Sequence, residues 1–428
     1  MSEPRHIHTN RDSAPHASQS SSGRKIQRSD AKPKAAASAS AARSTSKSRA
    51  SAPKQKAKPK KKAFRWWIPL VSIACVLGIG VGVALGYVNS VLNSIAPPEN
   101  APEIDETVQT APEFKGDVVN ILLVGIDYEE GRTYGDKDSN DGMTDMIMYI
   151  NYDLKNGKMN MLQIPRNTLV GFKVECDDTT GYTYRASNGQ INAIALSNDD
   201  GLAALADVIA NNYKLPVDYY ASIDMDALIQ MVDHFGGLDV YVPQDIKDKN
   251  GNVLQQGYRH LDGETVEYLV RQRHAYANGD LGRLNTQRYF YAALFQRVRT
   301  ATLGDIIKLM PVVQKYVKTN IPPTDLVALA YNFLSIDSAD IMVAQTPVYS
   351  GALFAPNPEK NFKGHSVLVP ARQPIADLLN QYFRTYTGEI PANELNFFDS
   401  HPHNNNATDA NVQFMGQLDH EAQQAGAQ

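Results

Sequence analysis

The chain is poor in cysteine, with two cysteines among 428 residues. Cys75 lies inside a long apolar run, and Cys176 is the single cysteine of the acidic part of the chain. An intramolecular disulfide in that part is therefore excluded. Cys176 also has no identifiable base partner that would make it a nucleophile, so we expect an inert thiol.

Charge is missing from residues 66–91, and no Lys or Arg follows Arg65 until Lys115. About 20 apolar residues suffice to span a bilayer. A cluster of lysines lies just before this stretch, so the positive-inside rule predicts a cytoplasmic N-terminus and an outer region after about residue 92. A cleaved signal peptide is the alternative, but the basic arm and the apolar stretch are both too long for one. We expect a single transmembrane helix over residues 66–91.

Acidic and large apolar residues are scarce in residues 1–65. This segment holds 17 of the 42 Lys and Arg but only three of the 46 Asp and Glu. It cannot bury enough apolar surface to offset the entropy lost on ordering, so a disordered cytoplasmic arm is predicted. Its place beside a membrane favours contact with anionic lipid, and the acidic remainder of the chain does not resemble a nucleic-acid binder.

Several catalytic signatures are also absent. The chain has no Gly-rich phosphate loop, no HExxH motif and no Ser-His-Asp ordering. These absences disfavour P-loop nucleotide hydrolysis, zinc proteolysis and serine hydrolysis.

Strand and helix patterns alternate through the outer region. Apolar runs predict strands at 118–126, 145–152, 158–164, 217–223, 238–242, 341–346 and 366–369. Helical periodicity predicts helices at 192–213, 225–235, 262–272, 280–303, 305–318, 323–334 and 372–384. We predict an α/β domain over residues 117–395, with a central mixed sheet and helices on both sides. Residues 92–116 are expected to be a linker, and residues 396–428 a disordered tail.

Arginines gather in the segment YLVRQRHAYANGDLGRLNTQ at 268–287. Asp280 stands where a helix begins, and Arg283 and Gln287 fall one turn apart on one face of it. A guanidinium fork near a helix N-terminus favours a ligand with many phosphate oxygens. A solvated helix with surface ion pairs is the alternative.

Carboxylates lie at the ends of two predicted strands. Asp127 follows the strand at 118–126, and Asp145 opens the next one. Such a pair could hold Mg²⁺ (or Mn²⁺), which combines one or two carboxylates with substrate phosphates; ordinary turn or cap aspartates are the alternative. Arg166 follows the third strand after a proline and could point to the same rim, or could be a surface residue. The apolar segments between 290 and 335 suit either a lipid chain or a plain core.

In order along the chain, NILLVGID, TDMIM, LQIPRN, QINA, DHFGGLDVYVP, LDGETVEYLVRQR and DLGRLNTQR resemble the LytR-CpsA-Psr family. The resemblance covers residues 118–300. It implies an α-β-α sandwich with a pocket for a polyprenyl tail. It also implies a single-pass plasma-membrane enzyme of Gram-positive-type bacteria with an extracytoplasmic catalytic domain. Such a phosphotransferase moves an anionic glycopolymer (teichoic acid, capsule or a related polysaccharide) from a polyprenyl-pyrophosphate carrier to peptidoglycan.

By position, the resemblance assigns metal binding to Asp127 and Asp145, and a catalytic role to Asp145 as well. It assigns pyrophosphate binding to the residues Arg166, Arg271, Arg273, Arg283 and Gln287, with Arg166, Arg271 and Arg283 also catalytic.

Three departures from the family pattern stand out. Met143 and Thr286 occupy positions where the family has Arg, and Asn167 occupies one where it has Asp. Two further functions remain open: a pyrophosphatase that uses water as the nucleophile, and a non-catalytic membrane regulator or lipid-binding scaffold.

Overall fold

The structure of the chain is a computed structural model. It describes residue 90 and residues 103–126, 143–170, 189–196, 201–247, 252–354, 365–397, 406–418 and 420. All of these belong to one compact unit, Trp67–Gln428. The expected cytoplasmic arm, and all of the expected transmembrane helix except Ser90, lie outside the described residues. Within the described ranges, no helix is both long and apolar enough to cross a membrane.

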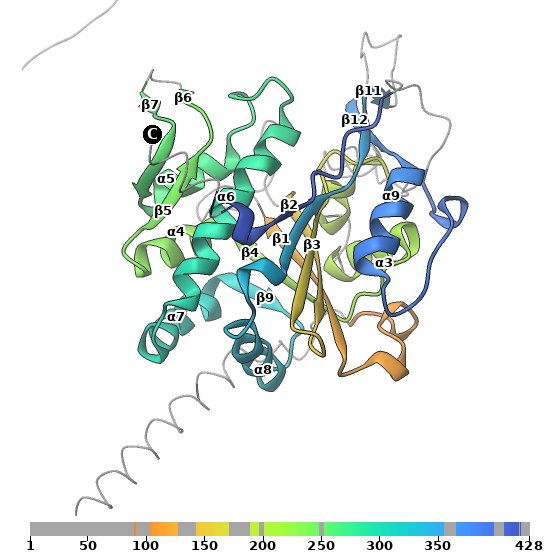
Figure 1. Cartoon of the computed structure of the whole chain (residues 1–428), viewed down its shortest axis with the longest axis horizontal. Coiled ribbons are helices and arrows are strands. Elements are labelled where there is room, and N and C mark those ends of the chain that lie inside the picture. Colours follow the sequence, from red (N-terminus) through yellow and green to blue (C-terminus); the bar gives the residue numbers. More distant parts are fainter. Residues whose placement is uncertain are drawn as a thin grey trace, which may run out of the picture. The chain divides into compact units, whose positions relative to one another are not determined.

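Seven strands form one mixed sheet in the order β13-β10-β3-β2-β1-β4-β9. β1 is parallel to β4 and β3 is parallel to β10, whereas the other neighbours are antiparallel. The expected central mixed sheet is thereby confirmed (Figure 1). The strands are β1 (Val118–Ile126), β2 (Thr144–Asp153), β3 (Lys158–Gln163), β4 (Tyr219–Asp224), β9 (Val317–Thr319), β10 (Ile341–Gln345) and β13 (Gln413–Phe414).

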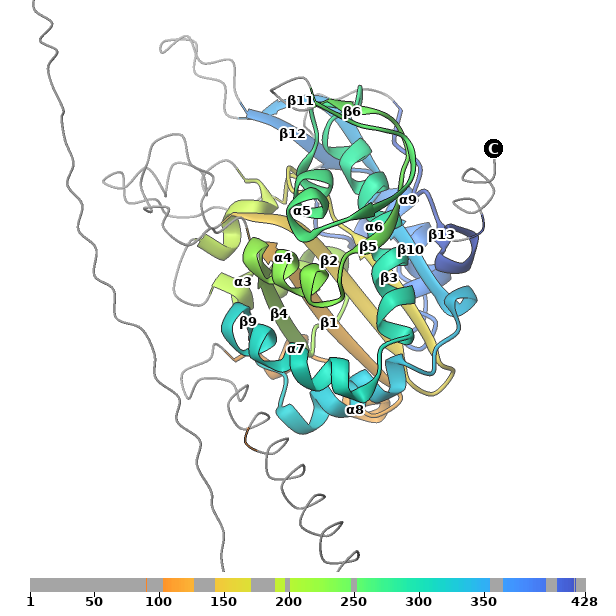
Figure 2. The same cartoon turned by 90° about the vertical axis from the view of Figure 1, so that its left-hand side faces the viewer.

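Helices cover both faces of the sheet, as the sequence predicts. Figure 1 shows α3 (Gly201–Tyr213) and α9 (Arg372–Leu378) on one side. The other side carries α4 (Met225–His234), α5 (Gly263–Arg271), α6 (Asp280–Arg299), α7 (Leu303–Tyr316) and α8 (Pro323–Phe333). Figure 2 shows this second side facing the viewer. The domain also has three small two-stranded sheets: β5 (Leu238–Val242) with β8 (Gly257–Leu261), β6 (Ile246–Lys247) with β7 (Val253–Leu254), and β11 (Val348–Phe354) with β12 (His365–Pro370). Figure 1 shows the β11–β12 pair nearer to α9 than to α5.

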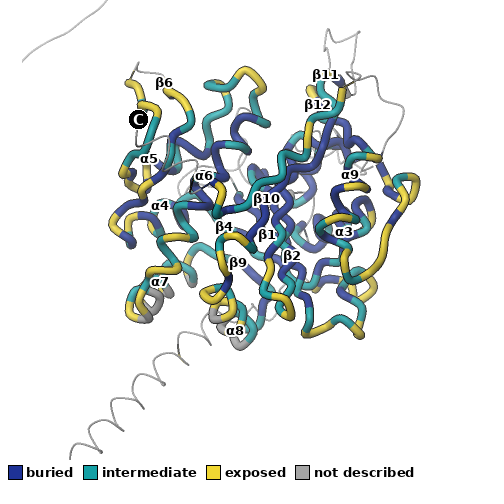
Figure 3. The backbone as a smooth tube through the Cα atoms, viewed as in Figure 1, coloured by how far each residue is buried: buried dark blue, intermediate teal, exposed yellow. Residues whose placement is uncertain are grey.

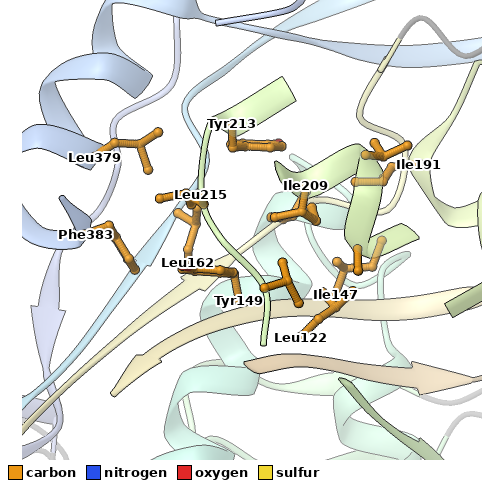
Figure 4. Packing of buried hydrophobic residues seen from close by; sticks show 14 of the residues in the cluster. Leu122, Ile147, Tyr149, Leu162, Ile191, Ile209, Tyr213, Leu215, Leu379 and Phe383 are labelled. Atoms are coloured by element: carbon orange, nitrogen blue, oxygen red, sulfur yellow. The ribbon is translucent and has the colours of Figure 1, made fainter. Parts of the chain in front are cut away.

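Two hydrophobic cores follow from the alternation of side chains along each strand. On β2, Ile147 and Tyr149 face the core shared with α3 and α9, and Figure 4 shows both in one cluster with Ile209 and Phe383. Met148, between them in sequence, faces the other core with α4, α5 and α6. The central strands are accordingly the most buried part of the fold (Figure 3).

Helix boundaries agree with capping chemistry. Asp224 and Asp262 cap α4 and α5 by accepting hydrogen bonds from Ala227 N and Thr265 N. Gly236 follows α4 with a φ of 78°, which confirms the glycine stop that the sequence predicts.

The predicted helix over 192–213 is divided. Residues Ile191–Leu196 form a 3-10 helix, and α3 begins at Gly201. A Cβ on Gly201 would lie 1.9 Å from the Ala195 carbonyl oxygen. The two short elements therefore pack against each other too closely for any side chain at the first residue of α3.

The segments that flank the expected domain are partly folded. In the expected linker, Thr110 donates from its backbone N to Asp218 Oδ1 (2.8 Å) and from its hydroxyl to Oδ2 (2.6 Å). In the expected disordered tail, β13 pairs with β10, and Met415 and Leu418 are buried. For the described residues, the prediction of a structureless tail is therefore wrong, because this polar segment gains its order from pairing with a sheet edge far away in sequence.

Candidate functional site

The site begins at an irregularity between β1 and β2. Gly125 pairs with Met146 and Ile126 pairs with Thr144, so Asp145 has no residue opposite it on β1. Such a β-bulge redirects the side chain of the extra residue. A Cβ on Gly125 would lie 3.1 Å from the Met146 Cβ, so the glycine allows the strands to approach closely here. Asp145 is thereby aimed into the domain, with 9% of its surface exposed.

Arg166 reaches Asp145 from the end of β3. The loop after this strand is fixed by Thr168, whose backbone N and hydroxyl both donate to the Pro165 carbonyl, at 3.0 and 2.6 Å. Arg166 is 6% exposed and donates from Nη1 to Asp145 Oδ1. The sequence prediction that Asp145 and Arg166 share one rim of the sheet agrees with this contact.

Arg283 approaches the same carboxylate from the first turn of α6. Its Nη2 donates to the Asp145 carbonyl at 2.8 Å, and its Nη1 lies 3.7 Å from Asp145 Oδ2. Asp280, one turn earlier, places Oδ1 2.6 Å from Arg283 Nη2. With 2% exposure, Arg283 is among the most buried large side chains of the described chain. A buried charge of this kind requires such partners.

Arg271 and Gln287 extend this cluster. Arg271 Nη1 lies 2.5 Å from Glu267 Oε1, one turn earlier on α5, and Gln287 Nε2 donates to the Val270 carbonyl at 3.0 Å. Both side chains line the same cavity as Arg283. Arg273 is half-buried after the end of α5 and is not among the cavity-lining residues. The other four predicted pyrophosphate ligands lie together: Arg271, Arg283 and Gln287 line the cavity, and Arg166 joins them through its contact with Asp145.

Two guanidinium groups of the cluster retain unused donors. The Nε atoms of Arg166 and Arg283 are buried and have no hydrogen-bond partner among the described residues. A buried donor without a partner costs about 1–3 kcal/mol. An anion with several oxygens would satisfy both atoms, and charge-assisted bonds from guanidinium to phosphate are among the strongest in proteins.

The cluster closes one end of a cavity of about 350 Å³. The cavity runs between β2 and α6: Asp145 and Arg283 are in contact at one end, while Ile150 and Phe295 line it further along the same two elements. The five steps along the chain from Asp145 to Ile150 span about 17 Å, since a strand rises about 3.4 Å per residue. The twelve steps from Arg283 to Phe295 span about 18 Å on a helix, which rises about 1.5 Å per residue. The cavity is therefore elongated, with a charged end and an apolar interior.

Methionines form much of the apolar wall. Six of the chain's 11 methionines line the cavity: Met146, Met148, Met159, Met161, Met225 and Met231. Unbranched thioether side chains adapt to irregular ligands. The apolar segments between 290 and 335 suit either a lipid chain or a plain core, and five of their residues line this cavity: Phe290, Tyr291, Leu294, Phe295 and Phe333. The strand methionines were missed, although their alternation at 146, 148 and at 159, 161 places each pair on one face.

Asp224 is a second carboxylate in the cavity wall that the sequence analysis missed. It ends β4, pairs in register with Ile126 and caps α4. Burial raises the pKa of its carboxyl above the usual value, and the hydrogen bond from Ala227 N opposes that rise. Burial likewise raises the pKa of the Tyr291 hydroxyl, so this residue presents a neutral phenol to the cavity.

The three departures from the family pattern lie in different places. Met143 is buried, with 4% exposure, directly before β2. Asn167 is half-buried, and its carbonyl accepts from Leu368 N. Thr286 is buried on another side of α6, where its hydroxyl lies 2.6 Å from the Tyr276 hydroxyl.

The expected metal ligand Asp127 lies outside the described residues. Within the described ranges, no three His, Cys, Asp or Glu side chains gather in a group that could hold a metal ion. The chemistry still suits Mg²⁺, since Asp145 and Asp224 both bring carboxylates to the cavity and Mg²⁺ needs only one or two beside phosphate oxygens.

Known proteins show similarity over much of this domain. TagV of Bacillus subtilis (strain 168), a polyisoprenyl-teichoic acid–peptidoglycan teichoic acid transferase, is 30% identical over 258 residues, which are 56% of this chain and 62% of that protein. TagU of Bacillus mycoides (strain KBAB4), of the same description, is 27% identical over 276 residues, 64% of this chain and 84% of that protein. The chain thus spans less than two thirds of the length of TagV.

A solved structure supports the fold. Protein gbs0355 of Streptococcus agalactiae superposes with a TM-score of 0.50 at 19% identity, covering 72% of this chain and 96% of that one. The family model of LytR_cpsA_psr matches residues 89–383, which is more than half of the chain. The chain therefore belongs to the LytR-CpsA-Psr family.

Proposed function

We propose that this chain is a phosphotransferase that moves an anionic glycopolymer from a polyprenyl-pyrophosphate carrier to peptidoglycan. One observation carries the proposal: an elongated apolar cavity ends in a buried cluster of arginines. A ligand that fits both parts has a long hydrocarbon tail and a polyanionic head. A polyprenyl pyrophosphate has this form, and the relatives TagV and TagU are named as transferases of polyisoprenyl-linked teichoic acid.

In the proposed reaction, a hydroxyl of the acceptor attacks the phosphorus that is bonded to the glycopolymer. A new phosphorus–oxygen bond forms to the acceptor, and the bond to the bridging oxygen breaks. Polyprenyl phosphate leaves with the bonding electrons and the added negative charge. A carboxylate at this rim, Asp145 or Asp127, takes the hydroxyl proton.

The arginines neutralise the charge that develops on the phosphate oxygens. Arg283 lines the cavity and Arg166 contacts Asp145, and both have buried Nε donors without partners among the described residues, which suits an anion with several oxygens at this end. Arg271 lines the cavity beside them, and Gln287, held by the Val270 carbonyl, orients the head group. Fixed donors of this kind act where charge develops, because they require no reorganisation during the reaction. Arg273 lies outside this lining, and we assign it no direct contact.

Asp145 would hold Mg²⁺ together with Asp127, with Asp224 as a further carboxylate in the same wall. When bound, this ion neutralises phosphate charge and assists departure of the leaving group. Asp145 also fixes both guanidinium groups through its contacts with Arg166 and Arg283.

The N-terminal part of the chain places the domain at the membrane in this proposal. Residues 66–91 anchor the chain in the plasma membrane, and the domain lies on the outer side, where both the lipid carrier and peptidoglycan are within reach. The basic arm rests against anionic lipid, and no nucleic acid is expected as a partner.

The test is a transfer assay with the full chain in detergent, Mg²⁺, a polyprenyl-pyrophosphate-linked oligosaccharide and peptidoglycan fragments. Arg283→Ala should lower the rate by about 10²–10³-fold if this arginine meets the developing charge. Arg299→Ala removes an exposed arginine from the far end of the same helix and should keep the wild-type rate.

The products separate the rival functions. Polymer joined to glycan supports the transferase, whereas free polymer phosphate would indicate a pyrophosphatase. Lipid binding without turnover would indicate a scaffold. A fully active Arg283→Ala variant would remove Arg283 from the mechanism.

A further inference from the structure

A second pocket lies on another side of α6. It has a volume of about 820 Å³ and opens to solvent. Leu281, Gly282, Asn285 and Thr286 contribute one wall from the first two turns of α6, while Arg283 and Gln287 of the same turns line the lipid cavity. The first two turns of α6 are thus a common wall of both cavities.

The opposite wall comes from residues 408–412. These residues lie beyond residue 383, where the match to the family model ends. Buried Arg288 holds this segment in place, since its Nη1 donates to the Asn411 carbonyl and, at 2.8 Å, to Gln413 Oε1. Gln345 Nε2 donates to the Asp409 carbonyl at 3.2 Å. The pocket is therefore a fixed feature in the part of the chain that is described.

Two residues that line the pocket, Asn411 and Gly282, have unusual backbone environments. Asn411 has a φ of 47°, one of two positive values among the described non-glycine residues. Asparagine tolerates this region better than most residues, and such conformations cluster at functional positions. On the other wall, a Cβ on Gly282 would lie 2.4 Å from the Tyr276 Cβ and 2.5 Å from Asn278 Oδ1. Glycine there lets the loop before α6 fold against the helix and form the floor.

The chemistry of the lining is neutral and polar. Amides come from Gln244, Asn278, Asn285, Gln345 and Asn411, and Tyr276 adds an aromatic ring. Among the residues that the structure describes, no Lys or Arg lines the pocket, and Asp409 is its single carboxylate. This described lining therefore offers no cation to pair with a polyanion. Carboxamides both donate and accept hydrogen bonds, as sugar hydroxyl and acetamido groups do, and a tyrosine ring can cover the face of a sugar.

We infer that this pocket binds an uncharged glycan strand and, resting on the proposed function, that it holds the acceptor during transfer. Leu281 and Gly282 belong to the same turn of α6 as Arg283, so this one turn of helix separates a strand bound in the pocket from the cationic end of the lipid cavity. The donor and the acceptor would then occupy opposite sides of one helix. The charge of each side selects its own ligand, because arginines line one and neutral amides line the other.

The experiment measures binding of chitohexaose, a neutral N-acetylglucosamine oligomer, to the full chain in detergent by isothermal titration calorimetry. The variant Gln244→Ala/Asn285→Ala removes two half-exposed or exposed amides from the pocket. We expect its affinity to fall by about tenfold or more, since each lost hydrogen bond contributes modestly. Gln296→Ala removes an exposed amide of α6 outside the pocket and should bind as the wild type does.

Absence of wild-type binding, or equal binding by all three proteins, would overturn the inference. Tighter binding of a soluble teichoic acid oligomer than of chitohexaose would do the same. Ala410→Trp, which places a large ring in the pocket, provides a second variant whose fold is checked by circular dichroism and which should also lose binding.

A parallel donor assay separates this inference from the proposed function. The double variant should still bind the polyprenyl-pyrophosphate donor while transferring it slowly to glycan. Normal transfer by the double variant would end the acceptor role and leave the transferase intact. Glycan binding without transfer by the wild type would instead end the proposed function and leave the glycan site.

Discussion

Asp145 is the residue on which the site depends most, because one buried carboxylate faces two buried guanidinium groups. Removing one member of a buried ion pair leaves the other charge uncompensated, at about 3–5 kcal/mol. Asp145→Ala should therefore lower the midpoint of thermal unfolding clearly.

The matched control is Asp239→Ala. Asp239 pairs with His260 at the surface, with its side chain 78% exposed, and surface pairs contribute at most about 1 kcal/mol. Differential scanning fluorimetry of both variants gives the comparison. An Asp145→Ala protein as stable as the Asp239→Ala protein would show that the two guanidinium groups do not need this carboxylate.

Asp224 gives a prediction about pH. Burial raises the pKa of its carboxyl in the folded domain, so the charged form is less favourable there than in the unfolded chain. This group therefore lowers stability above its folded pKa, and the loss disappears as the pH falls through that value. Asp224→Asn keeps an oxygen for Ala227 N and removes the charge.

We expect Asp224→Asn to unfold at a higher temperature than the wild type at pH 7.5 and to lose this advantage near pH 4. Thermal unfolding at both pH values provides the measurement. A variant that is less stable at pH 7.5 would indicate that the charged carboxylate is held by a favourable partner instead.

The sequence predicts much of this cluster, since Asp145 opens a strand, Arg166 follows one and Arg283 lies in the first turn of a helix, where polar groups gather at the rim of a sheet. The sequence analysis did not select Asp224, because an aspartate between a strand and a helix is typical of an N-cap. Asp224 is indeed the N-cap of α4, and it also lines the cavity. Arg273 follows Arg271 by two residues and need not share its orientation, because α5 ends between them. Side-chain direction past a helix end is set by tertiary contacts rather than by spacing.

Among the elements, β2 and α6 together decide what the cavity accepts. Leu294, on the third turn after Arg283, lines the cavity far from the charged end and is half-buried. Leu294→Trp should shorten the usable cavity while leaving the arginines untouched. Transfer from a donor with a long polyprenyl chain should fall by about tenfold, since a buried cavity discriminates by size.

A short-chain donor should be turned over by Leu294→Trp nearly as fast as by the wild type. Gln296→Trp places the same ring on the exposed side of α6 and controls for general damage. If both donors lose activity equally in Leu294→Trp, the tail does not reach this part of the cavity.

The short strands at the edges of the sheet could not be predicted from sequence patterns. The strands at 118–126 and 158–164 were predicted within a residue or two, because they are long and apolar. β9 and β13, of three and two residues, were not predicted. β13 consists of Gln413 and Phe414 in a polar segment, and its order depends on pairing with β10 and on the buried guanidinium of Arg288. No local pattern contains that information.

For the whole molecule, the charge distribution on either side of residues 66–91 predicts that the folded domain faces outward. Replacing Cys176 by Ser and Asp239 by Cys gives one thiol at an exposed position of the domain. A membrane-impermeant maleimide should label this cysteine in intact cells, and a cysteine in place of Ser46 in the basic arm should react only after lysis. The reverse pattern would place the domain in the cytoplasm and end the transferase proposal.

The length of α6 is more constrained than its composition. A helix turns by about 100° per residue, so one residue inserted after Arg283 would rotate Gln287 away from the cavity that Arg283 lines and carry Thr286 toward it. A substitution at any one of these positions alters one contact, whereas an insertion or deletion reassigns every contact that follows on both sides. Homologues that keep both cavities should therefore differ in the residues of α6 but not in their number between Asp280 and Phe295.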